Sequence, residues 1–450
     1  MYGCQQHLIN SKQDVRAILE YICSEANKLT NCGIYYCRQM WFKADYFVKK
    51  YELDEQLKSN PHFKAMRSQF SWMQAPGAAV TSSACAQQTL HSVVESFTSF
   101  RRLNKLYRAG QLHFKPRLPN YRKKGGLAVV SYPSRWVKLI DGKLRFPLGN
   151  QVKAWFGIDS FLLPMPSNLD FKSIKEYRIV PRNGCFYIEF VYKRPKIQPV
   201  QSNGNVLGID PGLNNWLTCV SNIGKSFIID GRQVKSQNQW YNKQVAKLKS
   251  GKAQDYWDEQ LALTTEKRNR QMRDHVNKAA RFVINWCLAN DVTHIVFGWN
   301  KMNKDSIDIG KRNNQNFVQI PTSRLKNRIV QLCEEYGIRF IETEESYTSK
   351  ASFLDDDFLP TIGEKPVGEA SLKGLGWFES GKRVKRGLYR SGAGYLINAD
   401  CNGAANILRK VATRLGFDLA RVGRACLTAP RRYGLDSLSK QYRKRVRCAV

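Results

Sequence analysis

The sequence lacks the features of several common protein classes. Its 12 cysteines include no Cys-x-x-Cys pair, and several lie in apolar runs, so we expect buried, reduced thiols rather than disulfides. No apolar run approaches the roughly 20 residues that span a bilayer. The first residues have neither the charged nor the apolar region of a signal peptide. These absences predict a protein of the cytosol with no membrane partner.

Acidic residues are scarce relative to basic ones. The chain has 37 Asp plus Glu against 72 Lys plus Arg, which gives a formal net charge of +35. Such an excess repels itself in the free protein, and a polyanionic partner relieves the repulsion. Aromatic residues make up 12% of the chain, and many stand beside basic residues, as they do in stacking platforms on nucleic acid. The composition favours a nucleic-acid partner; a basic but otherwise ordinary enzyme is the alternative.

The first 200 of the 450 residues change character once. Residues 12 to about 120 predict helices, and residues 126 to about 200 predict short strands, among them 127–132 and 136–140, in a small β-domain with the form of a barrel. A basic, proline-punctuated segment from His113 to Lys124 joins the two parts. We expect this segment to contact a nucleic-acid backbone, although a solvated linker explains it nearly as well. The residues expected to make these contacts are Lys115, Arg117, Tyr121, Arg122, Lys123 and Lys124.

A second part of the chain is organised around Asp210. The run 206–209 predicts a buried strand that ends on this carboxylate, and two further apolar runs complete a three-strand meander. Helical and strand patterns then alternate to residue 342, which predicts parallel strands added beside the meander. The first of these helices carries a charged face with Arg273 and Lys278, which we expect to contact nucleic acid. Much later, Asp400 opens a helix that has Asn402 and Asn406 on one face.

Three motifs give the chain a specific resemblance. They are Gly208-Ile209-Asp210-Pro211-Gly212, Tyr347-Thr348-Ser349-Lys350, and Asn398-Ala399-Asp400 with its continuation to Leu408. Over residues 206 to about 412 the chain resembles TnpB (OrfB-family) proteins of bacterial insertion sequences, which are relatives of type V CRISPR effectors. The resemblance implies an RNA-guided DNA endonuclease of the bacterial cytosol. Its partners would be a guide RNA from the element end and a double-stranded DNA target with a short flanking motif.

The resemblance also implies a multidomain α+β fold. A ribonuclease-H-like (RuvC) α/β domain would comprise residues 204–345 and 396–450. A β-barrel wedge domain would comprise residues 1–11 and 121–203, with a helical recognition domain inserted at residues 12–120. Residues 346–395 would form an insertion that binds the target nucleic acid.

The chain departs from the family pattern at two places. In the family, the strand that corresponds to the one ending at Phe297 is usually followed by a metal-binding Glu. In this chain the residue at that position is Gly298. The family's zinc-finger cysteines are replaced by Ser352, Asp355, Arg390 and Ala393, so we expect no zinc.

The missing glutamate leaves Asp210 and Asp400 as two metal ligands, which hold a pair of Mg²⁺ ions (or Mn²⁺) poorly by themselves. The adjacent strand ends with Glu342, Glu344 and Glu345, and one of these could occupy the vacated position because neighbouring strands lie only about 4.8 Å apart. We expect Glu345 or Glu344 to do so, with Glu345 as the third metal ligand. The alternative is a nuclease-dead, RNA-guided DNA-binding protein that acts as a repressor or targeting subunit. A strand-joining transposase is a weaker third possibility.

Overall fold

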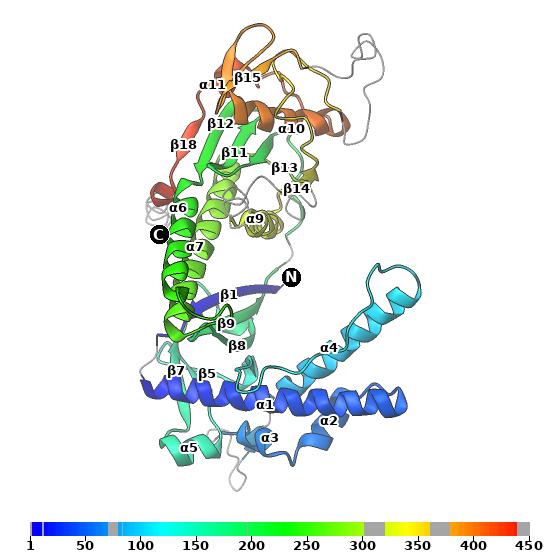
Figure 1. Ribbon diagram of the computed structural model, residues 1–450, viewed down its shortest axis with the longest axis vertical. Helices are drawn as coiled ribbons and strands as arrows, with labels where there is room; N and C mark the ends of the chain where they lie inside the picture. The colour runs from blue at the N-terminus through cyan, green and yellow to red at the C-terminus, as the bar shows by residue number, and fades with distance from the viewer. Residues whose placement is uncertain are drawn as a thin grey trace. The chain divides into compact units, whose positions relative to one another are not determined.

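The computed structural model describes residues 2–10, 13–70, 80–82, 84–195, 197–300, 320–360 and 379–438. The chain divides into two compact units, Met1–Pro195 and Lys196–Val450 (Figure 1). Both units combine helices with β-sheets, which confirms the mixed α+β class predicted from the sequence. Within the described ranges, no helix is long and apolar enough to cross a membrane.

The first unit is built on two long helices and several short ones. Their bounds are α1 Gln13–Ala44, α2 Lys50–Leu57, α3 Pro61–Ala65, α4 Ala84–Arg108 and α5 Asn150–Phe156. The α1 helix packs against α4, and their facing residues are small or apolar, as expected of helices that bury one face. The helical prediction for residues 12–120 is therefore confirmed for most of the described part of that range. The short antiparallel pair β2 (Ser68–Phe70) and β3 (Val80–Ser82) interrupts it.

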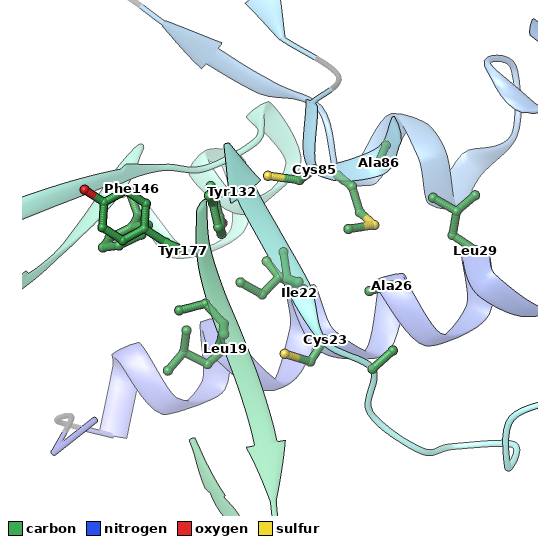
Figure 2. Close-up of a cluster of buried hydrophobic side chains, with 14 of the residues drawn as sticks. Leu19, Ile22, Cys23, Ala26, Leu29, Cys85, Ala86, Tyr132, Phe146 and Tyr177 are labelled. Carbon is green, nitrogen blue, oxygen red and sulfur yellow. The ribbon is translucent and has the colours of Figure 1, made fainter. Parts of the chain in front are cut away.

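Antiparallel sheets complete the first unit. One has the order β1-β9-β8-β4, and another has the order β5-β6-β7. Their bounds are β1 Tyr2–Leu8, β4 Val130–Pro133, β5 Lys138–Ile140, β6 Lys143–Pro147, β7 Ser160–Pro164, β8 Ile174–Arg182 and β9 Cys185–Lys193. Figure 2 shows where α1 and α4 meet these sheets: Leu19, Ile22 and Cys23 of α1 lie close to Cys85 of α4 and Tyr132 of β4 in one buried cluster.

Two strand predictions in this unit were wrong at their ends. The strand expected from residue 127 begins only at Val130, because the backbone N–H of Ala128 donates to the carbonyl of Cys23 in α1 (2.9 Å) instead of pairing in the sheet. The strand expected at 136–140 begins at Lys138, since Ser134–Trp136 forms a single 3₁₀ turn.

The second unit contains a six-stranded mixed sheet of order β14-β13-β10-β11-β12-β18. The strands β10 (Val206–Pro211), β11 (Asn215–Ser221) and β12 (Lys225–Asp230) form an antiparallel meander. Strands β13 (His294–Gly298) and β14 (Arg339–Thr343) are added in parallel beside β10, and β18 (Arg431–Tyr433) lies parallel to β12 at the other edge. The predicted meander with two parallel additions is confirmed, whereas β18 was not expected from the sequence.

Helices cover both faces of this sheet. On one face lie α6 (Arg232–Lys249), α7 (Glu259–Ala289) and α9 (Thr322–Tyr336), and on the other lie α10 (Ala399–Leu415) and α11 (Arg424–Thr428). Alternate residues of each strand point to opposite faces. Ile209 and Phe297 are buried against α7 and α9, and Val206 and Val296 are buried against α10. This alternation decides which carboxylates share a site.

A small antiparallel sheet precedes α10 along the chain. It consists of β15 (Lys382–Lys385), β16 (Leu388–Arg390) and β17 (Leu396–Asn398). The last strand leads directly into α10 through Asn398, whose side chain caps that helix. The side chain of Tyr389 in β16 is buried, and its hydroxyl donates to the carbonyl of Lys350 (2.6 Å).

Candidate functional site

Strand register brings Asp210 and position 298 to the same face of the sheet. Ile209 pairs with Phe297, so the next residues, Asp210 and Gly298, both lie on the face covered by α10. Asp210 stands at the end of β10, opposite buried Thr218 of β11, and is only partly exposed. A carboxylate at the end of a central strand is thereby presented at the edge of a helix-covered surface.

Asp400 enters the same site from the first turn of α10. The side chain of Asn398 accepts hydrogen bonds from the N–H groups of Asp400 and Cys401 (3.0 and 3.1 Å), which fixes the start of the helix. A carboxylate in the first helical turn is also favoured by the helix dipole. The amide of Asn215 in β11 donates to one Asp400 oxygen (2.5 Å), and the guanidinium of Arg383 in β15 lies 3.4 Å from the other.

A glycine lets Asp210 approach α10. A Cβ atom on Gly403 would lie 2.8 Å from Oδ2 of Asp210, so a side chain at residue 403 would push this carboxylate away from its present position. Burial raises the pKa of Asp210 well above its usual value. The negative charges of Glu345 and Asp400 raise this pKa further, and the positive charge of Arg383 partly opposes them. Two carboxylates from separate segments therefore act electrostatically on Asp210.

Glu345 lies beside the position of the missing family glutamate. A Cβ atom on Gly298 would stand 3.4 Å from Oε2 of Glu345 and 2.5 Å from Cδ1 of Ile407 in α10. The backbone N–H of Glu345 donates to the side chain of Asn300 (3.0 Å), which ties the segment after β14 to the segment after β13. The Glu345 side chain thus occupies space next to where a side chain at position 298 would begin.

The turn that follows Glu345 is fixed from α10. The amide of Asn406 donates to the carbonyls of Thr348 and Ala351 (2.9 and 2.8 Å), and the amide of Asn402 also donates to Ala351 (2.7 Å). Both asparagines are fully buried. The two residues that the sequence placed on one helix face are therefore anchors for the turn and do not themselves line the carboxylate site.

The other two acids at the end of β14 lie elsewhere. Glu342 pairs with Phe297, which places it on the α9 face, where its carboxylate forms an ion pair with Lys326 (2.6 Å). Glu344 forms an ion pair with Lys410 of α10 and accepts a hydrogen bond from the N–H of Ser346. Although burial alone raises the pKa of Glu344, these hydrogen bonds lower it below its usual value. Of the three candidate glutamates, only Glu345 acts on Asp210.

An arginine-rich cavity of about 390 Å³ opens onto Asp210 and Asp400. Its basic residues were not among those predicted from the sequence, although Arg383 and Arg386 belong to the basic run Lys382-Arg383-Val384-Lys385-Arg386. The four arginines that line the cavity are Arg232, Arg383, Arg386 and Arg432. Two of them, Arg232 and Arg432, form ion pairs with Asp230 (2.6 and 3.0 Å). The lining of the cavity therefore combines two carboxylates with four guanidinium groups.

The donor set suits a hard divalent cation in its chemistry, because it consists of carboxylates at mutually repelling positions. In the part of the chain that the structure describes, however, no group of three His, Cys, Asp or Glu side chains is close enough as it stands to hold a metal ion. Asp210, Asp400 and Glu345 would have to draw together around such an ion.

A carboxylate joins the segments that carry the replaced zinc-finger positions. Asp355 accepts hydrogen bonds from the backbone N–H groups of Gly392 (2.5 Å) and Ala393 (3.0 Å) and from the hydroxyls of Ser352 and Ser380. Burial raises the pKa of Asp355, but the hydrogen bonds outweigh it and hold the pKa below its usual value. One acidic side chain thus connects the turn after β14 with the loop between β16 and β17.

The basic segment 113–124 is attached to α1 by its backbone. Asn27 and Asn31 of α1 donate to the carbonyls of Lys123 (3.0 Å) and Arg122 (3.1 Å). The six side chains predicted to contact nucleic acid are all exposed, namely those of Lys115, Arg117, Tyr121, Arg122, Lys123 and Lys124.

The two basic residues predicted on α7 have partners within the protein. Arg273 forms an ion pair with fully buried Glu266 (2.8 Å), and Lys278 forms one with Asp274 (2.5 Å). They contribute less free positive charge than the segment 113–124.

Solved structures are similar to this chain only at low sequence identity. A search of curated proteins found no match. One solved structure with similarity is described as the cryo-EM structure of the Cas12f1-sgRNA-target DNA complex; its TM-score is 0.33 at 14% identity, covering 90% of this chain and 98% of that chain. Another, CasPhi-2 (Cas12j) bound to crRNA, has a TM-score of 0.35 at 9% identity, covering 94% of this chain and 99% of that chain.

A family match covers the start of the mixed sheet. Residues 189–304 match the sequence model of the family OrfB_IS605, described as "Probable transposase". This stretch contains Asp210 at the end of β10 and Gly298 at the end of β13. The match confirms the resemblance to OrfB-family (TnpB) proteins that the motifs of the sequence predicted.

Proposed function

We propose that this protein is an RNA-guided DNA endonuclease with a ribonuclease-H-like (RuvC) site. The match of residues 189–304 to the OrfB family supports the class, and the formal net charge of +35 supports a nucleic-acid partner. The mixed sheet, with three antiparallel strands and two parallel ones beside Asp210, supports the ribonuclease-H-like assignment. Guide pairing would select the DNA target, while the protein would read a short flanking motif.

The observation that carries the proposal is the position of Glu345. Its carboxylate lies beside Gly298 and raises the pKa of Asp210, as does Asp400. Asp210, Asp400 and Glu345 would hold divalent cations, Mg²⁺ or Mn²⁺, which supply Lewis-acid stabilisation of the phosphate and activation of water. Glu345 would thereby take over the role of the glutamate that is absent at position 298.

The surrounding residues would orient the DNA strand. Arg386 and Arg383 line the cavity above the carboxylates, where their guanidinium groups suit the non-bridging oxygens of a phosphodiester. Asn215 fixes the rotamer of Asp400 through the 2.5 Å hydrogen bond. Asn402 and Asn406 hold the turn after Glu345 and therefore limit the movement of its carboxylate.

We extend the proposal to the remaining parts of the chain. Residues 1–11 and 121–203 would form a wedge domain of barrel type, residues 12–120 a helical recognition domain, and residues 346–395 an insertion that contacts the target. The exposed basic side chains of segment 113–124 would bind the phosphate backbone of the guide RNA. The protein would act in the bacterial cytosol, where the free thiols of its described cysteines are stable.

A second function is favoured by the contacts of Asp400. The Arg383 guanidinium and the Asn215 amide both engage its carboxylate, which are the contacts expected if an arginine replaced a metal ion as the counter-charge. In that case the protein would bind guide RNA and DNA without cutting, as a repressor or targeting subunit.

A cleavage assay distinguishes the two functions. RNA that copurifies with the protein would be sequenced to define the guide, and DNA carrying the matching target would be incubated with the complex and Mg²⁺ or Mn²⁺. We expect the wild type to cut, and Asp210→Asn, Asp400→Asn and Glu345→Gln to lose cutting by orders of magnitude while still binding DNA, because each removes a charge that a divalent ion needs.

The other two glutamates at the end of β14 supply matched controls. Glu342→Gln lies on the opposite face of the sheet, and Glu344→Gln breaks only the ion pair with Lys410, so both should cut at nearly the wild-type rate. A wild type that binds its target but never cuts would support the second function instead. Cutting that survives Glu345→Gln would refute the role of Glu345.

A further inference from the structure

A cavity of about 670 Å³ in the first unit has no role in the proposed cleavage. It lies among α1, α3, α5 and the segment between α4 and β4, and its volume is in the range of small-ligand sites. The residues that line it include one continuous face of α1, together with an aromatic wall and several polar groups. Its polar and aromatic side chains include those of Glu20, Tyr21, Glu25, Lys28, His62, Gln151 and Trp155.

The aromatic wall is formed by Trp155 and Tyr21. Their ring centroids are 5.1 Å apart in an edge-to-face arrangement, which holds the indole in place. Trp155 is nevertheless 61% exposed, so an indole face remains open to a ligand. Burial raises the pKa of Tyr21 to about 12, with a further contribution from Glu25, so its hydroxyl stays protonated. A flat aromatic ligand could stack on this wall.

The polar floor is formed around buried Glu25. One of its oxygens contacts Nζ of Lys28 (2.7 Å), and the other contacts Nδ1 of His62 (2.7 Å). Because an ionised carboxylate only accepts hydrogen bonds, Nδ1 carries the proton in this pair, and Nε2 is the ring nitrogen left to bind a ligand. Glu25 is 6% exposed, so it fixes the imidazole from inside the protein.

The charge of the cavity argues against a phosphate as its occupant. In a chain with a formal net charge of +35, the lining contains two glutamates and a single lysine, and that lysine is already paired with Glu25. A phosphate would therefore meet no unpaired lysine or arginine among the lining residues. The lining instead offers a stacking face together with groups that donate and accept hydrogen bonds, which is the combination that recognises a base.

We propose that this cavity binds one unpaired nucleobase, stacked on Trp155 and hydrogen-bonded by Nε2 of His62 and the amide of Gln151. A glutamine amide can donate and accept at once, so it can distinguish bases by their edges. The proposal rests on the nucleic-acid-binding part of the proposed function, but it is independent of cleavage. Unpaired bases of DNA and of RNA offer the same stacking faces and hydrogen-bonding groups to this cavity. The experiment therefore tests DNA strands and RNA strands separately.

The test measures binding of the full-length protein to short dye-labelled single strands in the presence of EDTA, so that no cutting occurs. Homopolymers of each base, as DNA and as RNA, are compared with a fully abasic DNA strand of equal length. Trp155→Ala should weaken binding to at least one base-containing strand about 5- to 100-fold, the usual effect of losing a base-stacking side chain. Binding to the abasic strand should stay unchanged, and Gln151→Ala should alter the preference among bases.

The chain offers a matched control and a second readout. Trp257 is 54% exposed and lies in the other unit, so Trp257→Ala should leave all strands bound as in the wild type. Strands containing 4-thiouracil should crosslink to peptides that carry Trp155 or Tyr21. Trp155→Phe, which keeps a stacking ring, should retain most of the affinity.

Three outcomes would overturn the proposal. They are a Trp155→Ala variant that behaves like Trp257→Ala, an equal loss of binding to the abasic strand, and crosslinks found only outside the cavity. The first would mean that Trp155 does not stack on a base. None of these outcomes would change the result of the metal-dependent cleavage assay. A failure of the proposed nuclease function would be seen separately, in that assay.

Discussion

Glu345 and Gly298 are neighbours across the end of two parallel strands: Oε2 of Glu345 lies 3.4 Å from the point where a Cβ on residue 298 would stand. The position of the Glu345 carboxylate therefore depends on the absence of a side chain at residue 298. A side chain at position 298 would compete for the space beside the Glu345 carboxylate, and it would also meet Cδ1 of buried Ile407 at 2.5 Å.

Restoring the family glutamate should therefore fail to improve the enzyme. Gly298→Glu forces Ile407 to repack and adds a fourth carboxylate beside Asp210, Asp400 and Glu345. We expect a loss of about 1–3 kcal/mol in the free energy of unfolding and no gain in cleavage. Urea denaturation and the cleavage assay measure the two effects. Gly298→Ala serves as the control for the added Cβ alone, and faster cutting by Gly298→Glu would contradict the role given to Glu345.

Removing an anchor of the Glu345 turn should lower activity without touching a carboxylate. Asn406→Ala removes the side-chain donor to the buried carbonyl of Thr348 and leaves the carbonyl of Ala351 with the Asn402 amide alone, which destabilises the protein by about 1–3 kcal/mol. At a temperature where the variant remains folded, cleavage should fall more than target binding. Thr413→Ala, on the exposed side of the same helix, should change neither. Unchanged cleavage in folded Asn406→Ala would show that the turn does not position Glu345.

The Asp355 cluster should stabilise its region without metal. Asp355→Ala removes the acceptor of four hydrogen bonds, and we expect the free energy of unfolding to fall by about 2 kcal/mol. Asp356→Asn removes the charge of a neighbouring acid whose side chain is 89% exposed, and asparagine suits its backbone φ of 57°, so this change should have a much smaller effect. Zinc chelators should alter neither the melting temperature nor cleavage. Stoichiometric zinc in the purified protein, measured by elemental analysis, would refute this.

Guide RNA binding should depend steeply on salt through the segment 113–124. In one variant, Lys115, Arg117, Arg122, Lys123 and Lys124 are all replaced by Gln. The plot of the logarithm of the binding constant against the logarithm of the salt concentration should become less steep, by about 0.7–0.9 for each phosphate that the variant no longer neutralises. Lys278→Gln is the control, because Lys278 is already paired with Asp274. Filter-binding titrations over a salt series measure the slope. An unchanged slope in the quintuple variant would make this segment a solvated linker.

Buried thiols should destabilise the protein at high pH. Burial raises the pKa of Cys333 to about 12 from the ordinary value of 9.0. The stability due to this thiol is complete below the unfolded pKa and is lost as pH rises toward the folded one, because the unfolded chain releases the proton first. Between about pH 9 and pH 12 each such thiol should lower the free energy of unfolding by about 1.4 kcal/mol per pH unit.

Comparison with a variant isolates this effect from other groups that titrate in the same range. In Cys333→Ala the free energy of unfolding should fall less steeply as pH rises, and the difference from the wild type is the contribution of one thiol. Urea denaturation at a series of pH values measures this decline. Equal declines in the wild type and the variant would mean that the thiol keeps its ordinary pKa when folded.

The sequence by itself determined the elements that carry the site. Apolar runs of β-branched residues predicted β10 to β14, and the break at Pro211-Gly212 placed Asp210 at a strand end. The helical pattern that opens at Asp400, with Asn402 and Asn406 one turn apart on one face, predicted α10 and the place of Asp400 at its start. These features depend on local backbone preferences and on the alternation of side chains, which a single sequence displays.

Only the tertiary structure decided which glutamate lies beside Asp210. Strand alternation removes Glu342 from the site, but the choice between Glu344 and Glu345 depends on Lys410, Asn300 and Ile407, which come from other segments of the chain. The four donors to Asp355 likewise come from two stretches, near residues 352 and 380–393. Contacts between residues so far apart along the chain arise from packing and from the satisfaction of buried polar groups, and no local pattern in the sequence encodes them.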